Sequence, residues 1–255
     1  MLRNLVFLAA ALSLAACAGA DADDSTDVDT DSIIGGTNDN GDPAVVALFA
    51  HAPGDNAGFI CTATVISPTV LLTAAHCVDP ASTGPGLVTD VVFSPDFNTA
   101  PASSIVRAKE THFDPAFDVN DLGNSHDIAV VILPSPTSIA PKPINRAPIT
   151  NALLNRSVRI VGYGSNTHAN AGAGRKRQTT TTLKAFDANL LRIGTSSRQT
   201  CHGDSGGPAF MTINGVETIV GVTSFGNDVS ETLVCINGGF DTRVDRFTGF
   251  VDQFL

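Results

Sequence analysis

The chain has 255 residues, of which 43% are hydrophobic and 16% are charged, and its formal net charge is -10. This length suits one large all-β unit or two small barrels, and a chain with so acidic a balance is not expected to bind nucleic acid. The 23 glycines and 14 prolines, together with many short apolar runs, favour strands and turns over helices.

The first 20 residues are predicted to be a signal peptide rather than part of the fold. One basic residue, Arg3, precedes an apolar stretch that is short for a membrane-spanning helix, and small residues follow. Two endings remain open. The stretch "LAAC" at 14–17 is similar to the lipobox of bacterial lipoproteins, which favours lipidation of Cys17, whereas "AGA" at 18–20 fits ordinary cleavage before Asp21 with Cys17 discarded.

Residues 21–32 are predicted to be an acidic, disordered linker. They contain six aspartates among small and polar residues, which repel one another and offer no material for a core. The apolar sequence "IIGG" follows abruptly at 33–36. Six of the 25 acidic residues and one of the 15 basic residues lie before position 33, so that the remaining chain is only mildly acidic.

From residue 33 onward, apolar runs separated by Pro, Gly and Asp predict strands. In the first half these runs lie at 44–50, 59–67, 70–77, 88–93, 104–113 and 128–133. A Pro-rich stretch at 134–143 marks a link, after which strands are predicted at 158–164, 179–186, 207–213, 218–226 and 240–244. Residues 246–255 space their apolar side chains like one face of a closing helix. The basic residues Arg175, Lys176 and Arg177 are predicted to lie in a solvated loop.

The cysteine count indicates an exported chain with two disulfides. There are five cysteines, and an odd number in an exported protein needs an explanation. If Cys17 is lipidated or discarded, Cys61, Cys77, Cys201 and Cys235 remain, and an oxidising compartment would pair them. Pairing of Cys77, most plausibly with Cys61, would hold the neighbouring His76 in place.

The stretch "CHGDSGGPAF" at 201–210 carries the strongest chemical signal. A serine hydroxyl is a weak nucleophile unless a base takes its proton, and Ser205 stands between glycines that let the backbone turn sharply. The N–H groups of Gly203 and Ser205 would then form an oxyanion hole. Taken alone, the same residues also fit an ordinary turn.

Two further residues fit the remaining roles of such a site. His76 ends the run "LLTAAHC" and would be the base, although a lone histidine there is more often a core residue. Asp127 stands directly before an apolar run, where a buried carboxylate needs a partner such as an imidazole N–H. The alternative for Asp127 is a strand-start aspartate that bonds nearby backbone N–H groups.

Six motifs, in order, give the chain a resemblance to the trypsin/chymotrypsin-like serine endopeptidases. They are "IIGG" (33–36), "TAAHC" (73–77), "DIAVVIL" (127–133), "CHGDSGGP" (201–208), "TSFG" (223–226) and "GFDTRV" (239–244). The resemblance runs from Ile33 to the C-terminus. It implies two six-stranded antiparallel Greek-key β-barrels, at roughly 33–140 and 141–245, packed together with a short C-terminal helix.

The resemblance also implies roles for individual residues. His76 would be the general base, Asp127 its orienting partner and Ser205 the nucleophile. In this family the chain is cut before an Ile-Ile-Gly-Gly-like sequence, and the new α-ammonium pairs with the acid before the nucleophile; here these groups are Ile33 and Asp204. The residue before the cut is Ser32 rather than the usual Arg or Lys, which makes a trypsin-like activator doubtful.

The substrate pocket is predicted from the same resemblance. Gln199 would form an uncharged pocket floor, so a preference for uncharged rather than Arg or Lys side chains is expected. Gly226 and Gly239 would be open walls, Thr200 would add a hydroxyl, and a Cys201–Cys235 disulfide would staple the rim. Ser224 would line the site beside the triad, and Phe225 with Gly226 would pair with an extended substrate strand.

No cofactor or metal is predicted, since the histidines are scattered and no acidic calcium loop is seen after residue 32. The expected partners are protein or peptide substrates and an unknown activating protease, with membrane attachment only through a lipid on Cys17. The expected location is outside the cytoplasm, secreted or anchored. Two alternatives from other classes are a catalytically inactive, protease-like binding module on the cell surface and a structural surface lipoprotein.

Overall fold

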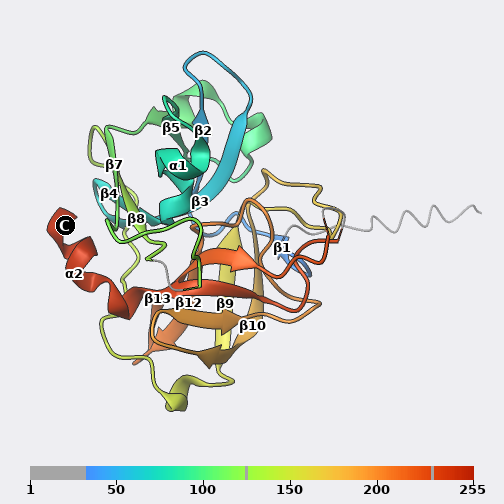
Figure 1. Ribbon diagram of the computed structural model, residues 1–255. Helices are drawn as coiled ribbons and strands as arrows, with labels where there is room; N and C mark the ends of the chain where they lie inside the picture. The colour runs from blue at the N-terminus through green and yellow to red at the C-terminus, as the bar shows by residue number, and fades with distance from the viewer. Residues whose placement is uncertain (1–32, 124–125, 231–232) are drawn as a thin grey trace, which may run out of the picture.

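Strands dominate the part of the chain that the structure, a computed structural model, describes: residues 33–123, 126–230 and 233–255. The predicted signal peptide, the lipidation site Cys17 and the acidic linker lie outside the described residues. Two antiparallel sheets, each curled on itself, form the molecule (Figure 1). After one short strand that joins the second sheet, the chain completes the first sheet and then forms the rest of the second. No helix among the described residues is long and apolar enough to cross a membrane.

The first sheet closes through a strand that is broken in two. Its order is β6-β5-β2-β3-β4-β8-β7. These strands are β2 Val45–His51, β3 Gly58–Ser67, β4 Val70–Thr73, β5 Val88–Val92, β6 Ile105–Arg107, β7 Glu110–Phe113 and β8 Ala129–Ile132. Between β6 and β7, the Ala108 N–H bonds the Thr89 carbonyl on one edge and the Lys109 N–H bonds the Ile132 carbonyl on the other. The two edges therefore meet, and the sheet is a barrel.

The second sheet closes by direct pairing of β9 with β10. Its strands are β9 Ser157–Gly162, β10 Arg177–Phe186, β11 Leu190–Ile193, β12 Pro208–Ile213, β13 Val216–Gly226 and β14 Gly239–Arg243, with β1 Thr37–Asn38 added beside β10. In each barrel the fourth strand returns beside the first, β5 beside β2 and β12 beside β9. This arrangement is the Greek key.

The predicted fold class is confirmed, with differences in detail. Each sheet contains seven strands among the described residues, because one strand of the first barrel is split and β1 joins the second. Strand β11 was not predicted. The strand predicted at 70–77 ends at Thr73, and Ala75–Cys77 form a 3-10 helix, η1. The pairing of Thr37 with Gln178 places the start of the described chain against the second barrel.

The C-terminal helix is short and packs on the first barrel. Helix α2 covers Thr248–Val251, and 3-10 turns at Val244–Arg246 (η5) and Asp252–Phe254 (η6) flank it. Phe247 and Val251 are buried in the core cluster of the first barrel. The remaining short helices are α1 Pro80–Thr83 and the 3-10 turns η2 Phe97–Thr99, η3 Ala102–Ser104 and η4 Asn151–Leu153.

The two barrels pack together through buried side chains, although the interior of the second barrel also forms a separate cluster of its own. Side chains of the second barrel, among them Val161, Tyr163 and Phe210, are buried with those of the first. The Tyr163 hydroxyl donates to the Ser94 carbonyl at 2.7 Å, which ties the end of β9 to the first barrel. Each fully buried aliphatic or aromatic side chain of this size contributes about 1.5–3 kcal/mol. The two barrels are therefore firmly packed against each other.

The prediction of a solvated basic loop at 171–178 is wrong for two of its three cations. Lys176 is buried, and its ammonium donates to the backbone carbonyls of Asp42 at 2.5 Å and Val45 at 3.1 Å. Burial lowers the pKa of Lys176 below its usual range. Arg177 is also buried, at the start of β10, whereas Arg175 stays exposed. These carbonyls lie about 130 residues earlier in the chain, so Lys176 links two segments that are distant in the sequence.

Candidate active site

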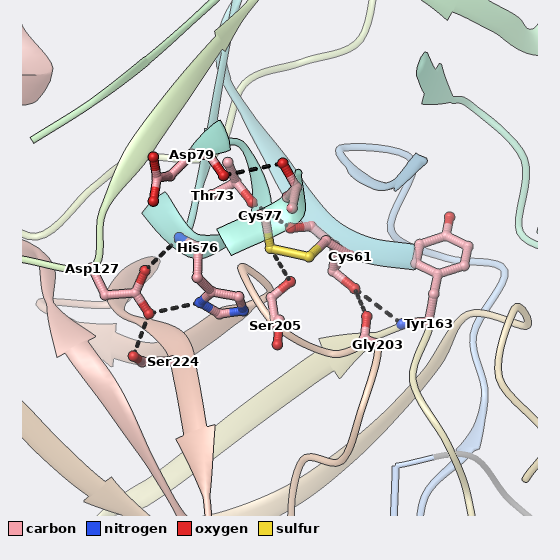
Figure 2. The surroundings of a disulfide bond; sticks show 12 residues. Cys61, Thr73, His76, Cys77, Asp79, Asp127, Tyr163, Gly203, Ser205 and Ser224 are labelled. Carbon is pink, nitrogen blue, oxygen red and sulfur yellow. Dashed lines mark hydrogen bonds and ion pairs between the residues drawn. A yellow bond between two sulfur atoms is a disulfide. The ribbon is translucent and has the colours of Figure 1, made fainter. Parts of the chain in front are cut away.

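His76 lies where β4 gives way to a tight turn. The strand ends at Thr73, and the turn η1 projects the His76 side chain towards the cleft while Ala75 and Cys77 are buried. The disulfide Cys61–Cys77 joins this turn to β3, as predicted from the sequence. His76, the candidate base, is thus held between two buried residues and beside the Cys61–Cys77 disulfide (Figure 2).

Asp127 is fully buried just before β8 and faces His76. Its Oδ1 accepts the His76 backbone N–H at 2.9 Å, and its Oδ2 accepts from His76 Nδ1 at 2.8 Å. Burial opposes ionisation of this carboxyl, but the charge and hydrogen bonds of His76 outweigh burial and hold the pKa of Asp127 below its usual value. The histidine is therefore oriented with its other nitrogen, Nε2, directed away from Asp127 (Figure 2).

Two hydroxyls complete the environment of Asp127. The Ser224 hydroxyl donates a very short hydrogen bond to Oδ2, and the Thr242 hydroxyl donates to the Asp127 backbone carbonyl at 2.9 Å. Ser224 was predicted to line the site, and the structure adds this bond. Both donors come from the second barrel, so a residue of the first barrel is held in place by the second.

Ser205 lies on the opposite side of the His76 ring from Asp127 (Figure 2). Among the described residues, no hydrogen bond joins His76 to Ser205. In sites without substrate this bond is often long and shortens when substrate binds. The Ser205 carbonyl accepts the Thr62 N–H at 2.8 Å and lies 3.6 Å from the Cys77 sulfur. Because that sulfur is in a disulfide and carries no hydrogen, the second contact is packing rather than a hydrogen bond.

Two backbone N–H groups in the loop around Ser205 make no hydrogen bond within the described part of the chain. Within the described chain, neither the Gly203 N–H nor the Ser205 N–H donates to a protein acceptor. The loop is fixed by other bonds: the Thr62 hydroxyl donates to the Gly203 carbonyl at 3.0 Å, and the Asp204 N–H donates to the Cys201 carbonyl at 2.9 Å. Gly203 has a φ of 98°, which a residue with a side chain rarely adopts. Two donors on a rigid loop are suited to bind a developing oxyanion.

Asp204 points away from the cleft into the second barrel. It is fully buried, and its carboxylate accepts the Gly164 N–H at 2.7 Å and the Cys201 N–H at 2.8 Å. A side chain at Gly162 or Gly164 would overlap the carboxylate. Burial raises the pKa of Asp204 to about 7, although both backbone bonds favour the charged form. No ion pair to Asp204 is formed by the described residues.

A cleft of about 720 Å³ lies between the barrels at this site. Of the predicted substrate-binding residues, Thr200, Ser224, Phe225 and Gly226 line it, together with the candidate triad members His76 and Ser205. The other two, Gln199 and Gly239, are not among the described residues that line it. The rim disulfide Cys201–Cys235 is present, as predicted.

Gln199 is buried beneath the cleft with its amide group occupied. Its Oε1 accepts the Gly238 N–H at 2.7 Å, and its Nε2 donates to the Ser196 carbonyl at 3.3 Å. Gly239 lies behind Thr200, since a side chain there would contact the Thr200 hydroxyl and the Phe225 carbonyl. Gln199 therefore places no charge beneath the cleft.

One edge of β13 is open along the cleft. Pairing of β12 with β13 reaches Val222, and Thr223 exchanges backbone bonds with Gly206 and Gly207. Beyond Thr223, β13 continues to Gly226 and pairs on its other side with β14 only, as far as the structure describes the chain. A strand edge of this kind accepts an extended peptide.

Sequence reasoning missed a further buried acid near the site, Asp241. It lies on β14 opposite Thr223 and Leu191, and its Oδ2 has no hydrogen-bond partner in the described part of the chain. Burial, with a contribution from Asp204, raises the pKa of Asp241 to about 8. The only sequence signal was a lone aspartate inside the short strand run at 240–244.

Two groups of side chains in the described chain come close enough to suggest a metal site, but their chemistry does not fit one. The groups are Cys61, His76 and Cys77, and His202, Asp228 and Cys235. All three cysteines are in disulfides and cannot supply thiolates.

Comparison with protein families decides the class: the family described as Trypsin matches residues 33–251. The chain belongs to the trypsin family. It is 30% identical over 207 residues to brachyurin of Leptuca pugilator, a match that covers 76% of this chain and 85% of brachyurin. It is 27% identical over 213 residues to chymotrypsin-like elastase family member 1 of Bos taurus, which covers 76% of this chain and 78% of that protein.

A third relative is longer than this chain. Urokinase-type plasminogen activator of Gallus gallus is 27% identical over 246 residues, which cover 83% of this chain and 54% of that protein. The trypsin family and these relatives make the chain a serine endopeptidase of the trypsin/chymotrypsin type, whose substrates are proteins or peptides.

Proposed function

We propose that the chain hydrolyses peptide bonds through an acyl-enzyme, with Ser205 as nucleophile, His76 as general base and Asp127 as orienting partner. The observation that carries this assignment is the 2.8 Å hydrogen bond between His76 Nδ1 and the buried Asp127 carboxylate. It favours the tautomer in which Nε2 has a free lone pair facing Ser205.

The steps follow from this arrangement. Ser205 Oγ attacks the substrate carbonyl carbon while Nε2 of His76 takes the hydroxyl proton, and the Gly203 and Ser205 N–H groups bind the negative oxygen. The C–N bond then breaks, and His76 returns the proton to the departing amine. Water, deprotonated by His76, next attacks the acyl carbon. The ester bond to Ser205 Oγ then breaks, His76 returns the proton to that oxygen, and the carboxylic acid product leaves.

We further propose that the protein is made as a zymogen activated by cleavage before Ile33. The freed α-ammonium of Ile33 would pair with Asp204, a buried carboxylate that now has two backbone donors and no ion pair among the described residues. Such a pair is a strong switch, because removal of one partner of a buried ion pair typically costs about 3–5 kcal/mol.

The backbone at Ile33 supports a cut at this position. Ile33 is fully buried and has a φ of 56°, a value that β-branched residues rarely adopt. Such strain costs on the order of 1–3 kcal/mol. The angle φ is measured from the carbonyl carbon of the preceding residue, so cleavage after Ser32 removes the restraint on this angle. Because Ser32 is neither Arg nor Lys, an activator with another preference, or stepwise trimming of the linker, is expected.

Gln199 supports a preference for medium or large uncharged side chains at the scissile residue. Both ends of its amide are bonded to backbone, so no charge faces an incoming side chain from this position. A peptide library incubated with the activated enzyme tests this preference. Sharp cleavage after Arg or Lys would contradict it.

An active-site serine reagent tests the catalytic assignment. The full chain with Ser32→Arg is cut by immobilised trypsin, and N-terminal sequencing checks that the product begins at Ile33. A fluorophosphonate should then label Ser205 in the cut protein, slowly in the uncut protein, and not at all after His76→Ala. No observation favours the inactive binding module, which would remain unlabelled after the cut.

The two disulfides are typical of exported proteins, and export is part of the proposal. If Cys17 is lipidated, cleavage before Ile33 detaches the enzyme from its membrane. Fractionation of cells that produce the protein tests this step. Active enzyme with an intact linker would reject it.

A further inference from the structure

A histidine and an aspartate from two separate loops meet at the rim of the cleft. Nε2 of His202 lies 3.3 Å from Oδ2 of Asp228, and the side chains are 50% and 40% exposed. Both residues are fixed by the rim disulfide: His202 follows Cys201, and Asp228 accepts the Cys235 N–H at 2.7 Å. The pair is therefore held in a constant position beside the reaction site.

Asp228 dominates the charge of the cleft. Among the described residues that line it, Asp228 is the only carboxylate, and there is no lysine or arginine. Apart from two histidines, the remaining lining side chains are apolar or uncharged. Within the described lining, Asp228 is therefore the one acidic group, and it lies at the rim of the cleft.

The position of Asp228 follows from the open edge of β13. A substrate strand paired with Phe225 and Gly226 starts beside Ser224, which contacts the triad, and runs towards Asp228. Asp228 follows Ser224 by four residues, which is roughly 13 Å along an extended chain. Asp228 would therefore face a substrate side chain about three to five residues from the scissile bond.

We propose that Asp228 is a subsite for a basic side chain of the substrate, three to five residues from the scissile bond. This inference rests on the proposed function. The substrate class it names is an extended peptide with Lys or Arg at that distance from an uncharged scissile residue.

Peptide pairs test the proposal. The activated full chain is assayed with peptides that share one scissile bond and carry Lys, Ala or Glu at each of five positions on either side. At one or two positions, three to five residues from the bond, kcat/KM for Lys should exceed that for Ala by about two- to fivefold at pH 8 and low salt. The ratio should fall towards one in 1 M salt, which screens the charge of Asp228.

A variant and a control complete the test. Asp228→Asn should bring the Lys/Ala ratio to one. The control is Glu110→Gln, which removes another exposed carboxylate paired with a histidine, His112, outside the cleft lining; it should leave the ratio unchanged.

Equal rates for Lys and Ala peptides at every position, or a ratio that survives Asp228→Asn, would overturn the subsite alone. Failure of the activated protein to cleave any peptide would overturn the proposed function, and the inference with it.

Discussion

Asp127 accepts two hydrogen bonds from one residue, His76: the backbone N–H at 2.9 Å and Nδ1 of the ring at 2.8 Å. The backbone bond fixes the position of the His76 main chain, and the ring bond fixes the orientation of its imidazole. Because the carboxylate is fully buried, water does not compete for either bond. A small change at Asp127 therefore alters the orientation and the tautomer of His76 together.

Replacement of Asp127 by Asn tests this relationship. The amide is nearly isosteric, but it favours the wrong tautomer of His76, so we expect kcat to fall by about 10⁴-fold with little change in KM. Steady-state kinetics of the activated enzyme measure the effect. Asp118→Asn, in an exposed loop, is the control and should retain wild-type rates. A loss of less than tenfold in Asp127→Asn would contradict the assigned role.

Cleavage before Ile33 should change how stability depends on pH. In the uncut chain Asp204 has a pKa of about 7, so between about pH 4 and 7 the folded state keeps a proton that the unfolded state loses. Stability of the uncut chain therefore falls as pH rises through this window. In the cut chain the α-ammonium stabilises the ionised carboxylate, and this loss should disappear.

Urea unfolding of cut and uncut protein at pH 4, 5.5 and 7 measures the difference, in a Ser205→Ala background that prevents self-digestion. The two forms should be similar at pH 4, and the cut form should be more stable by about 2–4 kcal/mol at pH 7. With Asp204→Asn, cutting should no longer alter the pH dependence. Parallel curves for both forms in the presence of Asp204 would disprove the pairing.

Asp241 should make the protein less stable at alkaline pH. Its pKa of about 8 means that the folded state holds a proton which the unfolded chain releases near pH 4, so stability declines from about pH 4 to 8. Asp241→Asn removes this decline, and we expect it to stabilise the protein by about 2–5 kcal/mol at pH 8 but hardly at pH 4. The exposed Asp55→Asn provides the comparison, and equal gains at both pH values would count against the explanation.

The two disulfides should contribute similarly to stability and differently to catalysis. Cys61–Cys77 spans 16 residues and Cys201–Cys235 spans 34, which corresponds to about 3 and 4 kcal/mol of unfolding free energy. Paired Ala variants should show these losses in urea unfolding. Removal of Cys61–Cys77, next to His76, should mainly lower kcat, whereas removal of Cys201–Cys235, at the rim, should mainly raise KM. The opposite kinetic pattern would contradict these roles.

Short sequence motifs predicted most strands and named the three members of the candidate triad, because each motif is a compact run of residues with its own chemistry. Strand β11 was missed since it has only four residues and no alternation that distinguishes it from a loop. The end of β4 was placed too late, since the apolar run continues through Ala74 and Ala75 into the turn. Apolar periodicity does not tell a buried strand from a buried tight turn.

The remaining differences concern partners that are far apart in the chain. Lys176 looked solvated because its two acceptor carbonyls lie about 130 residues away. The pairing of His202 with Asp228 depends on two loops that meet only in the folded protein. Asp241 stands inside a predicted strand with nothing in the sequence to mark it as buried, and only the closed barrel shows that its Oδ2 is buried without a hydrogen-bond partner among the described residues.

The early attachment of β1 to the second barrel limits what an activating cut has to move. Thr37 already pairs with Gln178, and Ile34 is bridged to Gln199, so a chain that begins at Ile33 has only four residues before the sheet. Such a tether reaches roughly 13 Å at most, which keeps the new amino group at a local concentration of millimolar or higher around its target. The pairing step that follows the cut would thus proceed at a rate independent of enzyme dilution, without movement of the rest of the molecule.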